Sequence, residues 1–260
     1  ELEALGYQFV TNGDTETIVH GYEAWGTDVF ERLRGMFAIA IWDAKEKQLV
    51  LARDIFGIKP LYYQHEGNRL IWGSEIKSFL AHPRFKKELN REQLPQYLCF
   101  EYMNDSQTMF KDVHKLLPGH FMVFEDGTLR TECFYKITYK IDDSKSLDEW
   151  ADVIVKAFDE SVAAHEIADV EIGSFLSGGI DSSLAAYCMG QHAPDIKTFS
   201  VGYDIGCEDK LAEIAAQSDF EIKLNELEDA EEFAKWAHLP NWQVKVDARE
   251  FLDIVPTEQY

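Results

Sequence analysis

The stretch VEIGSFLSGGIDSSLAAYCMGQH, residues 170–192, decides the fold of the second half of the chain. Its apolar run 170–176 predicts a strand, SGGIDSS at 177–183 predicts a loop, and 184–192 predicts a helix. A second strand is predicted over IKTFSVGY, residues 196–203. Strand, loop, helix and strand in this order form a βαβ unit, so we predict an α/β domain with a parallel sheet.

The SGGIDSS loop has the composition of a phosphate site. Gly178 and Gly179 can adopt positive φ and lack Cβ atoms, so their backbone N–H groups can close on an anion. The helix that follows directs its free N–H groups and the positive end of its dipole to the same place. Further hydroxyl donors come from Ser177, Ser182 and Ser183.

Asp181 is the one acidic residue of this loop. A carboxylate beside an anion needs a cation, and a Mg²⁺ ion that accompanies pyrophosphate would supply it. The loop is not a Walker A motif, because it lacks GxxxxGK[ST]. The alternative interpretation is a plain Ser/Gly turn with a serine N-cap, but the strand before and the helix after it favour a phosphate loop.

The first 140 residues combine hairpin patterns with short helical patterns. Apolar, β-rich runs flank polar turns in three stretches, residues 35–54, 61–75 and 120–135. Helices are predicted between them from apolar spacing, over residues 15–26, 74–82 and 90–100. This mixture predicts an α+β domain with antiparallel sheets.

A polar run without periodicity, IDDSKS at residues 141–146, predicts a linker between domains 1–140 and 147–260. The stretch after it carries one apolar stripe and predicts a helix over 147–165. Beyond Tyr203 we predict three further helices, over residues 207–220, 229–239 and 248–260.

The charge and the ends of the chain suggest its setting. It carries 25 Lys and Arg against 47 Asp and Glu, a net charge of −22, which disfavours nucleic acid as a partner. No apolar run approaches the roughly 18 residues of a membrane span, and no basic and apolar leader is present, so we expect a cytoplasmic protein. Glu1 and Tyr260 do not look like natural ends, and we expect a fragment of a longer chain.

The cysteines and histidines show no metal or disulfide pattern. None of the cysteines pairs as CxxC, and no Cys/His cluster has zinc spacing. We therefore expect reduced, buried thiols at Cys99, Cys133, Cys188 and Cys207.

Several separated motifs of the first half, together with SGGIDSS, resemble the glutamine-dependent asparagine synthetases. The resemblance runs in order from the first residues to about Tyr203, and LARDIFGIKPLYY departs from the usual pattern only at Ile55. The motifs are GDTETIVHGYEAWG (13–26), LRGMFAIAIWD (33–43), LARDIFGIKPLYY (51–63), GSEIKSFLAHP (73–83) and KLLPGH (115–120).

For the first domain, the resemblance implies a class-II glutamine amidotransferase with an Ntn-hydrolase-like fold. The family's nucleophile is an N-terminal cysteine, which this chain lacks, so we expect no catalytic residue of amide cleavage here and an inactive fragment. Asp14 is expected to hold the α-amino group of glutamine, with a helix N-cap as the alternative role. Arg53, Asp54 and Lys59 are expected to shape the domain, or to form an ordinary ion-pair set.

For the second domain, the resemblance implies an ATP-pyrophosphatase-type fold that binds ATP and Mg²⁺. Ligands of such sheets lie at the carboxyl ends of the strands, where the SGGIDSS loop and the end of the second strand meet. In the family this region holds ATP, with Leu176, Val201 and Gly202 at the adenine. The alternative is that Leu176 and Val201 are ordinary core residues.

The implied reaction joins aspartate, glutamine and ATP into asparagine, through a β-aspartyl-adenylate and with release of AMP and pyrophosphate. A related amidotransferase, such as a β-lactam synthetase, and a catalytically dead binding relative are the alternatives. The stretch 204–245 departs from the family, and an insertion near 204–225 would explain this. A homodimer is compatible with the resemblance.

Overall fold

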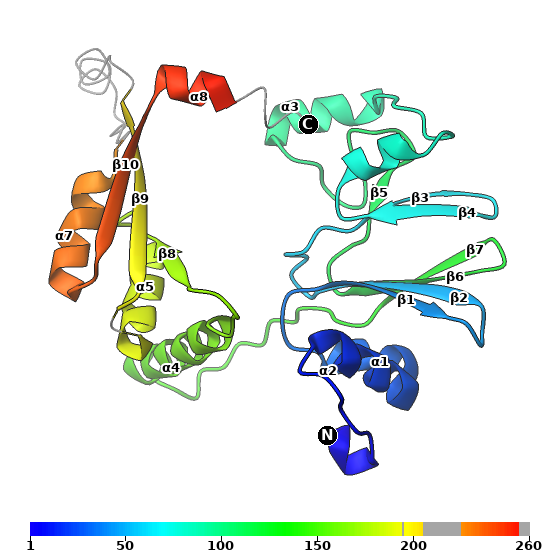
Figure 1. The fold of residues 1–260 in the computed structure, drawn as a ribbon, viewed down its shortest axis with the longest axis horizontal. Helices are drawn as coiled ribbons and strands as arrows, with labels where there is room; N and C mark the ends of the chain where they lie inside the picture. Colours follow the sequence, from blue (N-terminus) through cyan, green and yellow to red (C-terminus); the bar gives the residue numbers. More distant parts are fainter. Residues whose placement is uncertain (194, 205–224, 255–260) are drawn as a thin grey trace. The chain divides into compact units, whose positions relative to one another are not determined.

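The computed structural model describes residues 1–193, 195–204 and 225–254. The chain divides into two compact units, Glu1–Lys140 (unit 1) and Ile141–Tyr260 (unit 2), and residues 141–146 form neither helix nor strand. Each unit has its own sheets and helices (Figure 1).

Unit 1 contains two antiparallel sheets, with strand orders β1-β2-β6-β7 and β4-β3-β5. Asp126 and Gly127 join β6 to β7 with φ values of 46° and 78°, the two positive values that a type I′ turn requires. All three predicted hairpins are present, so the α+β architecture is confirmed. The strands are β1 (Ala38–Asp43), β2 (Gln48–Arg53), β3 (Tyr62–Glu66), β4 (Arg69–Gly73), β5 (His114–Lys115), β6 (His120–Glu125) and β7 (Thr128–Cys133).

The helices of unit 1 are short, and some are of the tighter 3₁₀ form. The predicted helix 15–26 is present and ends at Gly26, while 74–82 forms only a 3₁₀ helix. Pro95 lies in the first turn of the third helix, where its missing N–H costs no bond. The helices are η1 (Glu3–Leu5), α1 (Asp14–Trp25), η2 (Gly26–Asp28), α2 (Val29–Arg32), η3 (Ile76–Ala81), η4 (Arg91–Gln93) and α3 (Leu94–Phe100).

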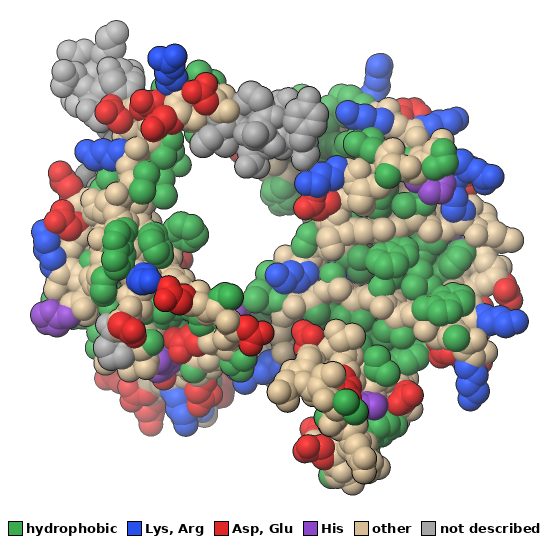
Figure 2. Space-filling model, in the orientation of Figure 1, with side chains coloured by type: hydrophobic (Ala, Val, Ile, Leu, Met, Phe, Trp, Pro, Cys, Tyr) green, Lys and Arg blue, Asp and Glu red, His purple; other side chains and the backbone are tan. Residues whose placement is uncertain are grey.

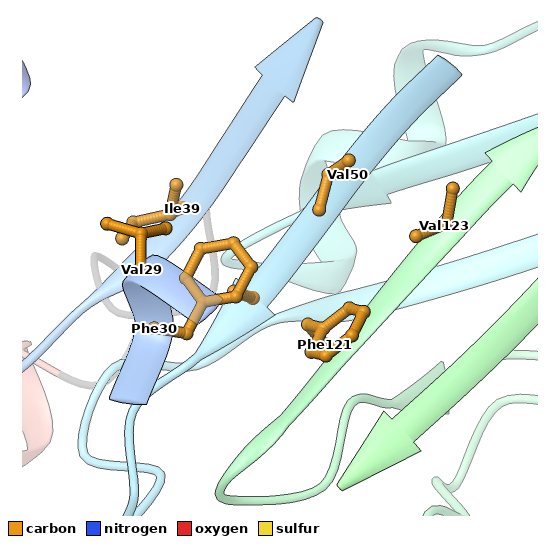
Figure 3. Packing of buried hydrophobic residues seen from close by; sticks show 7 residues of the cluster. Val29, Phe30, Ile39, Val50, Phe121 and Val123 are labelled. Carbon is orange, nitrogen blue, oxygen red and sulfur yellow. The ribbon is translucent and has the colours of Figure 1, made fainter. Parts of the chain in front are cut away.

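Two layers of apolar side chains hold unit 1 together. In the first, α1 and α2 cover the larger sheet, and the rings of Phe30 and Phe121 lie 5.6 Å apart within it (Figure 3). The second layer consists of Leu51, Leu61, Leu116 and Met122, all buried. The four come from the larger sheet and from segments next to the smaller one, so the central strands β2 and β6 of the larger sheet are buried on both faces.

Unit 2 is built on a parallel sheet with the strand order β10-β9-β8, which confirms the predicted α/β class. Ser146 and Glu149 form a capping box that starts the first helix. The strand β10 was not predicted. The elements are α4 (Leu147–His165), β8 (Gly173–Phe175), α5 (Ile180–His192), β9 (Lys197–Asp204), α7 (Leu227–Ala237), β10 (Asn241–Asp247) and α8 (Ala248–Ile254).

The two faces of the parallel sheet differ. On β9, Thr198, Ser200 and Gly202 are buried on the face that α5 and α7 cover. Phe199 and Val201 point to the other face, where Phe199 stacks on Trp242 of β10 at 5.8 Å, and all three are at least 40% exposed. Among the described residues, the core of unit 2 therefore lies on one side of its sheet.

Several predictions need correction. The helix α5 begins at Ile180, with Gly179 as its N-cap, so four of the seven residues of the predicted loop are helical. Cys99 and Cys133 are exposed, contrary to prediction, since they lie on a surface helix and an edge strand, whereas Cys188 is buried. The predicted helix 207–220 and Cys207 lie outside the described residues.

The apolar stripe of α4 is largely exposed, with Ile154 and Val155 more than half accessible. Among the described residues, no helix is long and apolar enough to cross a membrane. In the same part of the chain, no group of His, Cys, Asp and Glu side chains is arranged to hold a metal ion by itself.

Candidate functional site

The SGGIDSS loop lies directly after β8, at the carboxyl end of the parallel sheet. Gly178 has φ 79°, the left-handed conformation that glycine adopts without strain. Gly179 was expected to share this property, but it has φ −70° and ψ 161°, which is extended backbone open to any residue. A single left-handed residue is therefore enough to turn the chain into α5.

Two serines close the loop. Ser182 Oγ accepts a hydrogen bond from Ser177 N at 3.1 Å and lies 2.9 Å from Ser177 Oγ. Gly179 N donates to Ser177 Oγ at 3.3 Å. Ser183 differs from both, because it is buried and its hydroxyl has no partner among the described residues. The hydroxyls of Ser177 and Ser182 thus fix the loop, and both stay at its surface.

The first turn of α5 is open to an anion. Gly179 is the N-cap of this helix, and no described side chain caps the free N–H groups that follow it. Asp181 is exposed in the same turn. Its carboxylate is favoured there by the helix dipole, and it stands where it could meet a cation bound to phosphate oxygens.

A cavity of about 270 Å³ lies beside the loop. Four predicted residues line it: Leu176, Ser177, Ser182 and Val201. Leu176 itself is almost fully buried, and its carbonyl oxygen accepts from Ser200 Oγ at 2.6 Å. The sequence alone did not point to the other lining residues, which are Phe175, Phe199, Ser200, Glu226 and Leu227.

The two remaining predicted glycines pack against the start of α7. A Cβ atom on Gly178 would lie 2.5 Å from Asp229 Cβ and 2.8 Å from Ala230 N. A Cβ atom on Gly202 would lie 2.5 Å from Leu227 Cδ1. Glycine is therefore required at both positions for close approach of α7, which shapes one wall of the cavity.

In unit 1, Asp14 lines a second cavity, of about 610 Å³, together with Thr11, Asn12 and Arg32. Gly13 is the N-cap of α1, so Asp14 is not the N-cap and instead occupies the first turn of the helix. Its carboxylate is therefore free of the capping role.

Glu16 anchors the loop that leads to Asp14. Its carboxylate accepts hydrogen bonds from Val10 N at 2.8 Å and Thr11 N at 2.7 Å, and from the hydroxyl of Thr11. The hydroxyl of Thr11 and these two amides lower the pKa of Glu16 to about 2. The loop is thus tied to α1 two residues after Asp14.

Arg53 and Asp54 bind backbone groups, so they do not form the ordinary ion-pair set that was the alternative to a role in shaping the domain. Arg53 donates to the carbonyl oxygens of Gly57, Lys59 and Leu116 at 2.6–2.8 Å. Buried Asp54 accepts from four backbone amides, including those of Ile58 and Lys59. Burial alone would raise the pKa of Asp54, but these donors hold it below its ordinary value.

Known families match both units. The model of the glutamine amidotransferase domain matches residues 1–135, and the asparagine synthase model matches residues 154–259. The two units therefore define a protein that joins a glutamine amidotransferase domain to an asparagine synthase domain.

Individual relatives agree with this class. Glutamine-hydrolysing asparagine synthetase 1 of Bacillus subtilis is 38% identical over 208 residues, which cover 78% of this chain and 32% of that protein. Asparagine synthetase 3 of the same organism is 33% identical over 213 residues, covering 78% and 34%. A putative asparagine synthetase of Mycobacterium tuberculosis (strain H37Rv) is 36% identical over 211 residues, covering 76% and 32%.

The chain belongs to the family of glutamine-hydrolysing asparagine synthetases. It spans about a third of the length of these relatives.

Proposed function

We propose that the chain contributes the ATP-phosphate loop and part of the glutamine site to an enzyme that converts aspartate, glutamine and ATP into asparagine. The observation that carries this proposal is the open N-terminus of α5, which follows the Ser177–Ser182 loop beside a cavity at the carboxyl end of the sheet. Free backbone donors at a helix start suit phosphate, and a small apolar cavity next to them suits a nucleobase.

In this proposal unit 2 binds and orients ATP. The amides of the first turn of α5 hold the β- and γ-phosphates, and Val201 and the carbonyl side of Leu176 flank the adenine. The leaving group is then pyrophosphate, and attack on the α-phosphate by the side-chain carboxylate of aspartate gives the adenylate. Ammonia from glutamine would displace AMP from it.

The acidic Asp181 fits a Mg²⁺ ion in this arrangement, because hard cations take carboxylate oxygens and remain bound to phosphates. When bound, the ion neutralises part of the pyrophosphate charge. Asp181 would hold the ion with its exposed carboxylate, which does not line the cavity.

In unit 1, the proposed partner is glutamine. A carboxylate free of helix capping, at the edge of a cavity large enough for an amino acid, suits the α-ammonium group. Asp14 is that carboxylate, and Glu16 keeps its loop in place. A related amidotransferase with another acceptor has no observation in its favour here.

Pyrophosphate binding tests the phosphate loop directly. Isothermal titration of the 260-residue chain with Mg²⁺ and pyrophosphate should show saturable binding. Gly179→Val should weaken it at least about tenfold, because a branched side chain covers the N–H groups while the extended backbone accepts valine. Gly13→Val is the matched control, since Gly13 is also an N-cap glycine with extended backbone, at φ −82°.

Equal loss of binding in the Gly13→Val control, or none in Gly179→Val, would favour a plain turn. Asp181→Ala should lower affinity in the presence of Mg²⁺ and leave the weaker metal-free binding unchanged. An effect of equal size with and without Mg²⁺ would remove the metal role of Asp181.

A further inference from the structure

The two units carry very different charges. Residues 1–140 contain 17 Lys and Arg against 20 Asp and Glu, a net charge of −3, whereas residues 141–260 contain 8 against 27, a net charge of −19. Figure 2 shows Lys and Arg side chains gathered over the part of unit 1 near β4 and α3. The cations of this acidic chain are thus concentrated in one unit.

Some of these cations surround a cavity of about 870 Å³ in unit 1. We call it the basic cavity, after Arg69, Arg84, Lys86 and Lys111 in its lining. The hairpin β3–β4 contributes one wall, and residues 84–88 and 111–114 contribute the rest. Its volume lies within the range of about 300–1,000 Å³ that is typical of small-molecule sites.

The charges of the basic cavity are not balanced by pairing. Arg69 pairs with Glu66, and Lys111 Nζ lies 2.8 Å from Glu88 Oε1. Arg84 and Lys86 have no ion-pair partner within 4.0 Å in the described part of the chain. The lining contains a third carboxylate, Asp112, so two unpaired cations face one unpaired anion.

Gln64 adds a neutral polar group to the same cavity. It lies on β3 and lines the cavity, and its side-chain carbonyl oxygen is buried without a hydrogen-bond partner. An unpaired buried acceptor is unfavourable, and a rotation of the Gln64 side chain toward the cavity would let it accept from the hydroxyl group of a ligand. Cations for an anion and an acceptor for a hydroxyl therefore meet in one concave site.

We propose that the basic cavity binds a small phosphate ester that carries hydroxyl groups, the chemical class of sugar phosphates. Arg84 and Lys86 bind the phosphate, and Gln64 accepts from a hydroxyl of the ester. A concave site of this volume favours a small ligand over the flat acidic surface of a protein. The site is independent of the phosphate loop of unit 2.

Ribose 5-phosphate is the probe, and isothermal titration of the 260-residue chain at low ionic strength is the measurement. We expect saturable binding that weakens as salt is added, since exposed charges are screened. The double variant Arg84→Gln/Lys86→Gln should lose at least about tenfold in affinity. The matched control is Lys45→Gln/Lys47→Gln, which removes two cations from the exposed β1–β2 turn and should change nothing.

Two further variants define the outcome. Gly179→Val should leave ribose 5-phosphate binding intact, and a loss there would place the ligand at the loop of unit 2 and overturn the proposal. Gln64→Leu should bring the affinity for ribose 5-phosphate down to that for inorganic phosphate, while leaving the latter unchanged. Equal losses for both ligands would overturn the role of Gln64.

Absence of saturable binding would overturn the proposal, as would equal losses in the Lys45→Gln/Lys47→Gln control. Sedimentation tests whether this face binds a protein surface and not a small molecule. Self-association of the wild-type chain that the Arg84→Gln/Lys86→Gln variant abolishes, with no ribose 5-phosphate bound by either, would assign this face to an acidic protein surface instead. Thermal melting of each variant checks that the substitutions leave the fold intact.

Discussion

Unit 1 and unit 2 hold their candidate sites in different ways. In unit 1 the central strands of the larger sheet are buried on both faces, and the loops around the sheet are fixed by carboxylates that accept hydrogen bonds from backbone amides, as Glu16 and Asp54 do. In the described part of unit 2 the core covers one face of the sheet, and the loop is held by two neutral serine hydroxyls and by the close approach of α7 to glycines such as Gly178. The loops of unit 1 therefore depend on hydrogen bonds to charged carboxylates. The loop of unit 2 depends on close packing that only glycine permits.

This difference predicts which change, in pH or in side-chain volume, destabilises each unit. A hydrogen-bonded carboxylate responds to pH, because protonation removes the charge that the amides bind. A close-packed glycine responds to added volume and not to pH. The charges follow the same division, since unit 1 is nearly neutral and unit 2 carries most of the negative charge.

The largest effect should come from opening the core of unit 1. Phe30 is 1% exposed and packs between α2 and the larger sheet. Phe30→Ala should lower the free energy of unfolding by about 3–5 kcal/mol, through lost burial and the cavity that remains. Urea unfolding, followed by a probe in each unit, should show the loss in unit 1 alone. An equal shift in unit 2 would contradict this prediction.

A smaller effect should follow when the close approach in unit 2 is broken. Gly178→Ala places a side chain at φ 79° and within 2.8 Å of Ala230 N. Strain and displacement of α7 should cost about 2 kcal/mol. Gly179→Ala is the matched control, because its φ is −70° and its nearest neighbour, Ser177 Oγ, lies at 3.3 Å. Similar destabilisation by both alanines would show that α7 does not constrain the loop.

Asp54 should show the pH response expected of unit 1. Asp54→Asn leaves the amides of Ile58 and Lys59 without a charged acceptor and should cost about 2 kcal/mol at neutral pH. The pKa of Asp54 is lowered in the folded state, so its contribution is present above the ordinary pKa and is lost as pH falls through the folded pKa. Denaturant midpoints of the two proteins should therefore converge in acid, and a constant difference would contradict this.

Local signals explain which elements could be predicted from the sequence. The hairpin at Asp126-Gly127 was predicted because its turn needs two positive φ values, a property of a few adjacent residues. The strand β10 was missed, since its pairing partner β9 lies about forty residues earlier and two of its three apolar side chains, Trp242 and Val244, are exposed. Pairing between parallel strands so far apart leaves little signal in a short stretch of the sequence.

The residues of the candidate site likewise divide into those that a local motif predicts and those that only distant parts of the chain bring together. Ser177 and Ser182 could be chosen from the loop motif, because their roles depend on residues five positions apart. Glu226 and Leu227 could not, because only the return of the chain to the start of α7 brings them to the cavity. Asp54 was expected to shape the domain, with an ion-pair set as the alternative. Its burial among backbone amides was not predicted, since no local pattern in the sequence shows it.

The smallest effect should be local to the loop beside Asp14. The carboxylate of Glu16 accepts the amides of Val10 and Thr11, and its pKa lies at about 2, below the ordinary value of 4.5. Because the folded pKa is lowered, the anchoring is complete above about pH 4.5 and is lost as pH falls toward 2. Hydrogen exchange at Val10 and Thr11, corrected for the intrinsic pH dependence of exchange, should therefore lose protection over this interval. In Glu16→Gln, protection should be weaker at neutral pH and should not change with acid. Protection that falls equally in both proteins would show that another group, and not Glu16, holds the loop next to Asp14.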